Sequence, residues 1–353
     1  MRILYLGDDS EDRTSVHRAR ALVRLGHDVL HVNPQNAIPG SRAIAALNVR
    51  TGFRLFQSRV NRHILLAIEG RRFDLAWIDC GEQLGAAVHK VLKAMGAAIV
   101  NYNVDNPFCR RDRRKWDLYR RCVRFHDITV VVRKENVDEA KSFGANRVVR
   151  VFFSYDPVAH RSEGLPVSES GRHSAGVVFV GSWMPERGPL MVELRKRGVP
   201  LSILGDHWKK AKEWPLLRDV VRGPAVYGRD YVEAIRSGRV ALGLVSAGNR
   251  DLHTTRSAEI PFVGGAAFCA QRTSEHEAMY REGKEAAFWR TPAECAEQCR
   301  RLLADEAERL SVVDAARRRV VSLGLSNDEV LAWILERLAG AEGRECYPES
   351  LCT

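Results

Sequence analysis

The chain has 353 residues, of which 45% are hydrophobic, and its formal net charge is +11. This length exceeds one typical domain and fits two domains of roughly 150–200 residues each. No apolar run reaches about 18 residues, and the first one is too short for a signal peptide, so neither a membrane-spanning helix nor a secretion signal is expected. The positive charge leaves polyanions, anionic membrane surfaces and phosphorylated substrates as candidate partners.

The eight cysteines do not follow the spacing of a metal site or a disulfide framework. Cys295 and Cys299 are four residues apart on a predicted helix, but no matching second pair accompanies them. Several other cysteines lie in apolar segments that read as strands. The sequence therefore predicts reduced, structural thiols and a cytoplasmic protein.

The first half of the chain alternates between strand-like and helix-like segments. The apolar runs that predict strands are 2–7, 28–32, 73–79, 97–105, 128–132 and 147–153. The helical patterns between them cover about 16–26, 41–70, 82–95, 111–124 and 134–143. Strands separated by helices predict a parallel, doubly wound sheet.

The second half repeats this alternation after a segment that has no periodicity. Its predicted strands are 176–181, 200–205, 239–245, 266–270 and 286–289, followed by helices up to about residue 340. The division expected from these patterns is a Rossmann-like domain at 1–155, a linker at 156–175, a second Rossmann-like domain at 176–325, a terminal helix at 326–341 that reaches back toward the first domain, and a flexible tail at 342–353. Ligands of open α/β sheets bind beyond the carboxyl ends of the strands, which predicts an active site in an interdomain cleft.

The most informative segment is 251–277. Arg256 and Glu259 are three residues apart on a short predicted helix, so they share one face. A cation there can meet a diphosphate, and a carboxylate can accept hydrogen bonds from both ribose hydroxyls. Gly264 and Gly265 follow, and they permit a positive φ and a close backbone approach. The alternative is a surface salt bridge with a glycine cap.

The loop VGSWMPERG, at 180–188, connects a predicted strand to a helix. Gly181 and Ser182 end the strand, and Arg187 opens the helix. Glycines and a cation at a helix N-terminus suit a phosphate group. The alternative is a plain turn with an exposed arginine.

These segments resemble the CgeB-like (spore maturation protein B-like) glycosyltransferases, which have two Rossmann-like domains with parallel sheets (the GT-B architecture) and are related to glycosyltransferase group 1. The most specific parts are EIPFVGGAA at 259–267 and EHEAMYREGKEAAFW at 275–289. The resemblance implies transfer of a sugar from a nucleotide diphosphate sugar to a hydroxyl of a glycan, a lipid-linked molecule or a small molecule. It implies no cofactor and no metal, because no D-x-D motif lies in a suitable loop.

The resemblance also implies roles for individual residues. Glu259 matches the ribose-binding carboxylate, and Asp251 matches the carboxylate near the transferred sugar, with one methylene fewer. Ser182 stands where group 1 enzymes have an arginine, so Arg256 would supply the second cation beside Arg187. The other expected donor contacts are Ser246, Asn249, Gly181, Gly264 and Gly265. The aromatic residues that could stack on the nucleobase, or simply pack, are Trp208 and Tyr227.

Acidic residues end three strands of the first half. The turn at 7–12 is GDDSED and not GxGxxG, which disfavours a nicotinamide dinucleotide. Its Asp8 and Asp9, together with Asp79, could bind hydroxyls of an acceptor. Asp105 could act as general base or orient the acceptor hydroxyl, or it could only cap the turn before Pro107.

The segment 110–124 is rich in arginine, with aromatic residues between the basic ones. It could contact an anionic membrane at the inner face or a nucleic acid, or it could be an amphipathic helix with solvated arginines. Ser182 and Asp251 depart from the group 1 pattern and motivate a further alternative, a non-catalytic binding protein with the same fold. A sugar-nucleotide 2-epimerase shares this architecture, but its paired catalytic carboxylates and histidine are not evident.

Overall fold

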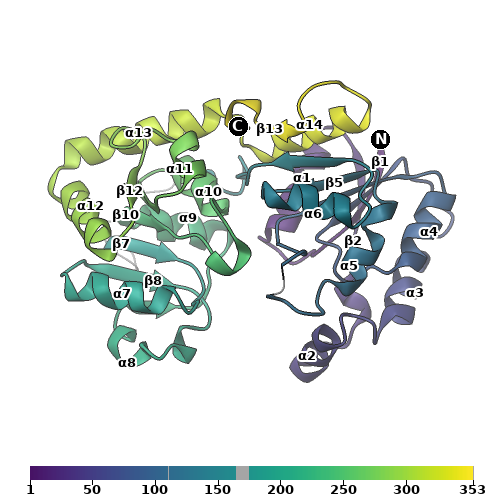
Figure 1. Ribbon diagram of the computed structural model, residues 1–353, viewed down its shortest axis with the longest axis horizontal. Coiled ribbons are helices and arrows are strands. Elements are labelled where there is room, and N and C mark those ends of the chain that lie inside the picture. Colours follow the sequence, from purple (N-terminus) through teal and green to yellow (C-terminus); the bar gives the residue numbers. More distant parts are fainter. Residues whose placement is uncertain (110, 164–174, 353) are drawn as a thin grey trace. The chain divides into compact units, whose positions relative to one another are not determined.

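The computed structural model describes residues 1–109, 111–163 and 175–352, and the chain divides into two compact units (Figure 1). Unit 1 comprises Met1–Phe152, Ser246–Asp251 and Asn327–Thr353. Unit 2 comprises Phe153–Val245 and Leu252–Ser326. Each unit is built around one parallel sheet, so the predicted fold class, α/β with two Rossmann-like domains, is confirmed.

The sheet of unit 1 has the strand order β2-β1-β3-β4-β5-β6-β13, and its paired strands are all parallel. Its strands are β1 (Arg2–Leu6), β2 (Asp28–Val32), β3 (Leu75–Asp79), β4 (Ala98–Asn103), β5 (Ile128–Val131), β6 (Val148–Val151) and β13 (Cys346–Tyr347). Its helices are α1 (Thr14–Arg24), α2 (Arg42–Arg50), α3 (Gln57–Ile68), α4 (Ala86–Ala94), α5 (Asp117–Cys122), α6 (Glu135–Ser142) and α14 (Asn327–Leu338). The central strands β3 and β5 are buried along their whole length, which is why they are continuous apolar runs.

The single helix expected at 41–70 is divided into two helices in the structure. The helical pattern at 41–70 contains α2 and α3, because Gly52 (φ +64°) and Phe53 (φ +59°) adopt left-handed backbone that ends the first helix. Val60 and Ile64 of α3 then pack into the core of unit 1.

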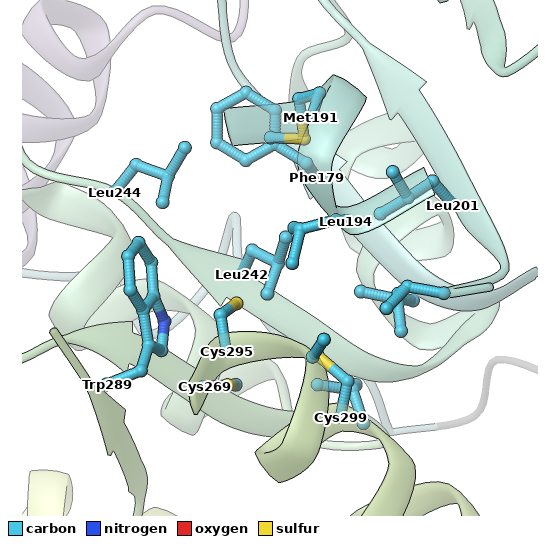
Figure 2. Packing of buried hydrophobic residues seen from close by; sticks show 14 of the residues in the cluster. Phe179, Met191, Leu194, Leu201, Leu242, Leu244, Cys269, Trp289, Cys295 and Cys299 are labelled. Atoms are coloured by element: carbon cyan, nitrogen blue, oxygen red, sulfur yellow. The ribbon is translucent and has the colours of Figure 1, made fainter. Parts of the chain in front are cut away.

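The sheet of unit 2 has the order β9-β8-β7-β10-β11-β12, again with parallel pairs. Its strands are β7 (Ala175–Val180), β8 (Leu201–Leu204), β9 (Val221–Gly223), β10 (Gly238–Gly243), β11 (Ala267–Gln271) and β12 (Ala287–Trp289). Its helices are α7 (Arg187–Lys196), α8 (Trp214–Leu217), α9 (Gly228–Arg236), α10 (Thr255–Val263), α11 (Ser274–Met279), α12 (Pro292–Ala304) and α13 (Glu306–Ser322). One buried apolar cluster joins β7, β8, β10 and β11 to α7 and α12 (Figure 2).

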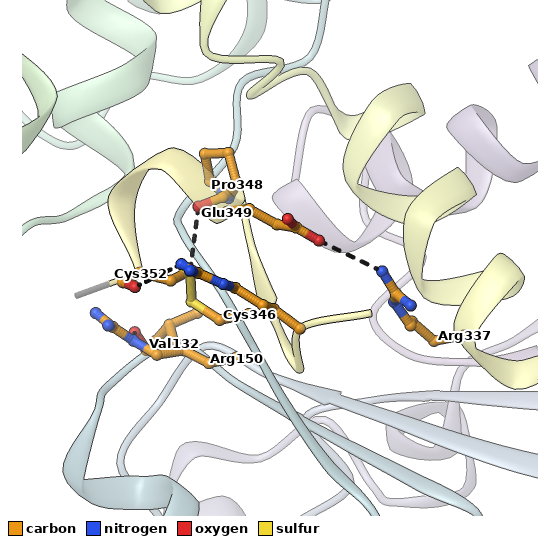
Figure 3. Close-up of a disulfide and its surroundings, with 8 residues drawn as sticks. Val132, Arg150, Arg337, Cys346, Pro348, Glu349 and Cys352 are labelled. Atoms are coloured by element: carbon orange, nitrogen blue, oxygen red, sulfur yellow. Dashed lines mark hydrogen bonds and ion pairs between the residues drawn. A yellow bond between two sulfur atoms is a disulfide. The ribbon is translucent and has the colours of Figure 1, made fainter. Parts of the chain in front are cut away.

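The chain after unit 2 differs in part from the expectation. Helix α14 belongs to unit 1, where it packs beside α1 (Figure 1). The tail, expected to be flexible, extends the sheet of unit 1 instead: Cys346 pairs with Arg150, and Leu351 is buried. A disulfide joins Cys346 and Cys352 (Figure 3). The expectation that all cysteines are reduced is therefore wrong for these two.

The expected linker at 156–175 also differs. Asp156 and His160 are buried in unit 2, so the first part of this segment belongs to the packed domain. Residues 164–174 lie outside the described part of the chain. None of the helices in the described residues combines the length and the apolarity needed to cross a bilayer.

Each sheet has one point at which the order of its strands along the chain reverses. In unit 1 the chain order reverses between β1 and β3, and in unit 2 it reverses between β7 and β10. Ligands of doubly wound sheets bind beyond the carboxyl ends of the strands at such a reversal. The residues that follow β1, β3, β7 and β10 are therefore the candidates for a functional site.

Candidate functional site

Helix α10 carries the two residues that the sequence placed at the donor site, and its ends are fixed locally. Thr254 and Ser257 form a reciprocal capping box at its start. Pro261 lacks an N–H, and the hydroxyl of Tyr280 donates instead to the carbonyl of Ser257, at 2.6 Å. At the other end Gly264 has φ +69° and Gly265 has φ +85°, which confirms the positive φ expected of this pair.

Arg256 and Glu259 form an ion pair that is mostly removed from solvent. The guanidinium donates to the carboxylate of Glu259, whose side chain is 2% exposed, and Arg256 Nε donates to the carbonyl of Val180 at 3.2 Å. The cation also lies over the ring of Tyr231, 4.4 Å from its centroid. The alternative of an exposed surface salt bridge is therefore wrong. The pair is anchored to the carboxyl end of β7, at the point where the order of the strands reverses.

The ionisation of this pair follows from its surroundings. Burial raises the pKa of Glu259, but the charge of Arg256 opposes this effect and the pKa is lowered overall. His160 Nε2 lies 3.7 Å from the second carboxylate oxygen of Glu259, and burial lowers the pKa of this histidine. Glu259 is thus an anion, His160 is neutral, and the side chain of Arg256 keeps 29% of its surface exposed for a ligand.

The loop after β7 is held by its own backbone and by Arg187. The N–H of Gly181 donates to the carbonyl of Leu204 at 2.8 Å, and Arg187 Nη1 donates to the carbonyl of Ser182 at 2.7 Å. Arg187 is only 8% exposed and lies over the ring of Phe179, so the alternative of an exposed arginine is wrong. Arg187 also lines a cavity of about 280 Å³ together with Leu244, which follows β10, and Gln271, the last residue of β11.

The two aromatic residues expected at the nucleobase differ in exposure. Trp208 is 2% exposed, packs in the core of unit 2 and donates its indole N–H to the carbonyl of Gly181, at 3.0 Å. This placement contradicts a stacking role for Trp208, because its buried side chain leaves almost no surface for a base. Tyr227, just before α9, is 40% exposed and keeps a surface on which a base can stack.

A buried histidine supports the start of α10. His276 Nδ1 contacts the carbonyl of Gln271 at 2.6 Å, and its Nε2 contacts the hydroxyl of Ser257 at 2.7 Å. A carbonyl only accepts, so Nδ1 carries the proton and Nε2 accepts from Ser257. Burial lowers the pKa of His276 from 6.5 to about 4, so the ring is neutral in the folded chain.

This histidine predicts a loss of stability in acid. The folded chain keeps His276 neutral down to about pH 4, whereas the unfolded chain protonates it near 6.5, so acid favours unfolding. Between about pH 7.5 and about pH 5 we expect His276 alone to remove about 2 kcal/mol from the free energy of unfolding. Urea titrations at both pH values check this, and His276→Gln should shrink the pH effect by that amount. An unchanged pH effect in the variant would contradict the neutral assignment.

Unit 1 has a buried ion pair at its own strand reversal. Arg18, on α1, donates through Nε and Nη2 to the carboxylate of Asp79, at 2.6 and 3.0 Å. The hydroxyl of Tyr5 also donates to Asp79, at 2.7 Å. The side chains of Arg18 and Asp79 are 5% and 4% exposed. Arg18 was not among the residues expected at a site, although its spacing from buried Ser15 and Leu22 places it on the inner face of α1.

A cleft of about 570 Å³ opens beside this pair. Asp8, Asp9 and Asp79, the three residues expected on the acceptor side, all line it. The carboxylate of Asp9 accepts from the side-chain amides of Asn33 and Asn36, at 2.7 and 3.1 Å, so it is fixed in orientation. Oriented carboxylates and amides are groups that bind hydroxyls of a sugar-like molecule.

The segment Ser246–Asp251 lies with unit 1 and not with the other expected donor residues in unit 2. Asp251 forms a buried ion pair with Arg133, and the side-chain amide of Asn106 donates to the carbonyl of Asn249, at 3.0 Å. Ser246 is buried, at 2% exposure. Asp251 thus differs from the expected group beside a sugar, because Arg133 neutralises its charge.

Asp105 follows β4 and is more accessible than the buried carboxylates of Glu259, Asp79 and Asp251. Its side chain is 41% exposed, and its carboxylate lies 3.4 Å from Lys115 Nζ. Its backbone N–H donates to the side chain of Asn103 at 2.9 Å. Asp105 can therefore reach a ligand, and its role as a base stays a prediction.

The basic segment at 110–124 is mostly a packed element. Its helix, α5, spans only Asp117–Cys122, and Trp116 and Tyr119 are 0% and 1% exposed in a small apolar cluster. Arg120 pairs with Asp117 at 2.8 Å. The described part of this segment, 111–124, fits the amphipathic alternative, and Arg110 lies outside the described residues.

Comparisons with known proteins bear on the fold of the chain and on the family of one segment. Residues 187–332 match the family model described as glycosyl transferase-like. The sucrose-phosphate synthase of Thermosynechococcus elongatus has a similar structure, with a TM-score of 0.69 at 11% identity, over 97% of this chain and 100% of that one. HepE of Anabaena, in complex with UDP-glucose, has a TM-score of 0.68 at 13% identity over the same shares. The α,α-trehalose 6-phosphate synthase of Burkholderia multivorans has 0.61 at 12%, over 96% and 98%.

At such low identity these structures bear on the fold alone, and they confirm the expected GT-B architecture. The family match adds a glycosyltransferase group 1-like domain over 187–332, which includes α10 and the EHEAMYREGKEAAFW segment. A search of curated protein sequences gives no match.

Proposed function

We propose that this chain is a glycosyltransferase of the CgeB-like group that moves a sugar from a nucleotide diphosphate sugar to an acceptor hydroxyl. The observation that carries the proposal is the pair of Arg256 and Glu259 at the carboxyl end of β7. It presents a fixed cation and a fixed anion, which are the two charges that a nucleoside diphosphate needs for its phosphates and its ribose.

The donor binds to unit 2. The exposed part of the Arg256 side chain meets the diphosphate, together with backbone N–H groups of the loop at Ser182 and of the start of α7. Glu259 accepts hydrogen bonds from the ribose, and Tyr227 stacks on the base. As the sugar leaves, negative charge grows on the diphosphate, and the cation of Arg256 stabilises it in the transition state.

UDP is the nucleotide to test first. The similar HepE structure contains UDP-glucose, and a similar trehalose-phosphate synthase is named as UDP-forming. We propose that the acceptor binds to the cleft of unit 1 through Asp8 and Asp9. Asp105 orients or deprotonates the attacking hydroxyl, since its carboxylate is accessible.

The test is a thermal-shift and transfer screen with UDP, GDP, TDP, ADP and CMP and their common sugars. We expect one nucleotide to raise the melting temperature and its sugar to be transferred or hydrolysed, and Glu259→Gln to lose about 10-fold or more in affinity because the ribose loses charged hydrogen bonds. Glu233→Gln is the matched control, since Glu233 lies on α9 and is 54% exposed in a surface pair with Arg229.

Three outcomes would count against the proposal. The absence of binding to every nucleotide would overturn the donor site. Binding without any transfer or hydrolysis would favour the non-catalytic alternative. Equal binding by the Glu259→Gln and wild-type chains would refute the ribose role.

A further inference from the structure

Three cysteines that are not among the proposed donor residues meet in the buried apolar cluster of unit 2. Cys269 lies on β11, and Cys295 and Cys299 lie one turn apart on α12, on the helix face that packs against the sheet (Figure 2). Their sulfur atoms all lie within 4.8 Å of one another, and each residue is 0% exposed. The strand and helix thus converge three thiols on one point.

The geometry points to a binding site for one trivalent thiophilic ion, such as arsenic(III), held by the sulfurs of Cys269, Cys295 and Cys299. Arsenic(III) keeps a lone pair and binds three sulfurs in a trigonal pyramid, so sulfurs at about 2.3 Å from the ion are separated by about 3.5 Å. The sulfur atoms therefore need to approach one another by about 1.3 Å or less, which side-chain rotation of cysteine can supply.

The buried, apolar surroundings of the three sulfurs favour an ion whose charge the three thiolates cancel. The group formed by the described residues contains three thiols and neither a carboxylate nor an imidazole, and apolar side chains such as Leu242 and Leu302 belong to the same buried cluster. A divalent ion with three thiolates carries a net charge of −1, which is costly to bury. Zinc would in addition lack its fourth ligand. A trivalent ion with three thiolates is neutral.

The binding step balances without an external oxidant. Arsenous acid, As(OH)₃, exchanges its three hydroxyl groups for three sulfurs: three As–O bonds and three S–H bonds break, three As–S bonds form, and three water molecules leave. No atom changes its oxidation state.

The alternative is that the three cysteines only fill space as small apolar residues. The two cases are separated by incubating the full chain with sodium arsenite for hours, since the buried site must open to admit the ligand, and desalting it. We expect about one arsenic per chain by elemental analysis. Cysteine alkylation followed by peptide mass spectrometry should show protection of Cys269, Cys295 and Cys299 together.

Variants sharpen the test. Cys299→Ser keeps the volume of the thiol and should reduce retained arsenic by about 10-fold or more, because two sulfurs hold the ion less tightly than three. The controls are Cys122→Ser, a buried cysteine of unit 1, and the double change Cys346→Ser/Cys352→Ser, which removes the disulfide; both should retain arsenic like the wild type.

Three results would overturn the proposal. These are no retained arsenic, full retention by Cys299→Ser, or protection of cysteines other than these three. The protection pattern of the wild-type chain decides the matter even if a variant fails to fold. A fourth result, zinc retained as well as arsenic, would refute the assignment to a trivalent ion. None of these four results depends on sugar transfer.

Discussion

Replacing Arg256 with alanine is expected to lower kcat/KM for sugar transfer by about 100-fold or more, because the leaving diphosphate loses the cation that stabilises its developing charge. The kcat/KM of Arg256→Lys should lie between those of the wild type and Arg256→Ala. Lysine keeps the charge but cannot donate both to Val180 and to Glu259 from a planar fork, as Arg256 does. Initial rates with the donor identified by the nucleotide screen measure the effect.

Arg256→Ala also leaves a buried anion without its cation, so the loss of stability must be measured separately from the loss of turnover. Without Arg256 the carboxylate of Glu259, 2% exposed, loses its cation, which costs about 3–5 kcal/mol of stability. The double variant Arg256→Ala/Glu259→Gln removes the stranded charge, so it should regain stability without regaining turnover. Arg229→Ala, on the exposed face of α9, is the control. Turnover restored in the double variant would contradict the role of Arg256.

Replacing Arg18 with methionine is expected to lower the free energy of unfolding of unit 1 by about 3–5 kcal/mol. Methionine fills a similar volume but removes both hydrogen bonds that Arg18 donates to Asp79. The charge of Asp79 then stays buried without its cation, although the hydroxyl of Tyr5 still donates to it. Adding Asp79→Asn should restore much of the loss, because the stranded charge disappears. Urea unfolding followed by signals from unit 1 measures the change.

The chain offers a close control for this experiment. Arg20 lies on the same helix and pairs with Glu11, but its side chain is 53% exposed, so Arg20→Met should change stability by less than about 1 kcal/mol. Equal losses in Arg18→Met and Arg20→Met would show that burial does not govern the pair of Arg18 and Asp79. Since Arg18 also lines the cleft of unit 1, the variant should bind the acceptor less well.

The sequence was sufficient for features that depend on neighbours along the chain. The alternation of apolar strands and amphipathic helices predicted both parallel sheets, and the proximity of Arg256 and Glu259 followed from helical spacing. The positive φ of Gly264 and Gly265 was expected because glycine alone adopts it without strain. The ordered tail was not predicted, because an edge strand of two residues has too short a pattern to detect.

Only the tertiary structure decided which side chains are buried and which residues they contact. The sequence by itself determined two α/β domains, the turns after their strands and the residue types at those turns, since these follow from local periodicity and backbone preference. It could not show that Trp208 is a core residue, that Arg133 neutralises Asp251, or that Cys269 meets Cys295 and Cys299. Those contacts join residues far apart in the chain, and burial and charge pairing between such residues arise only when the sheets and helices pack.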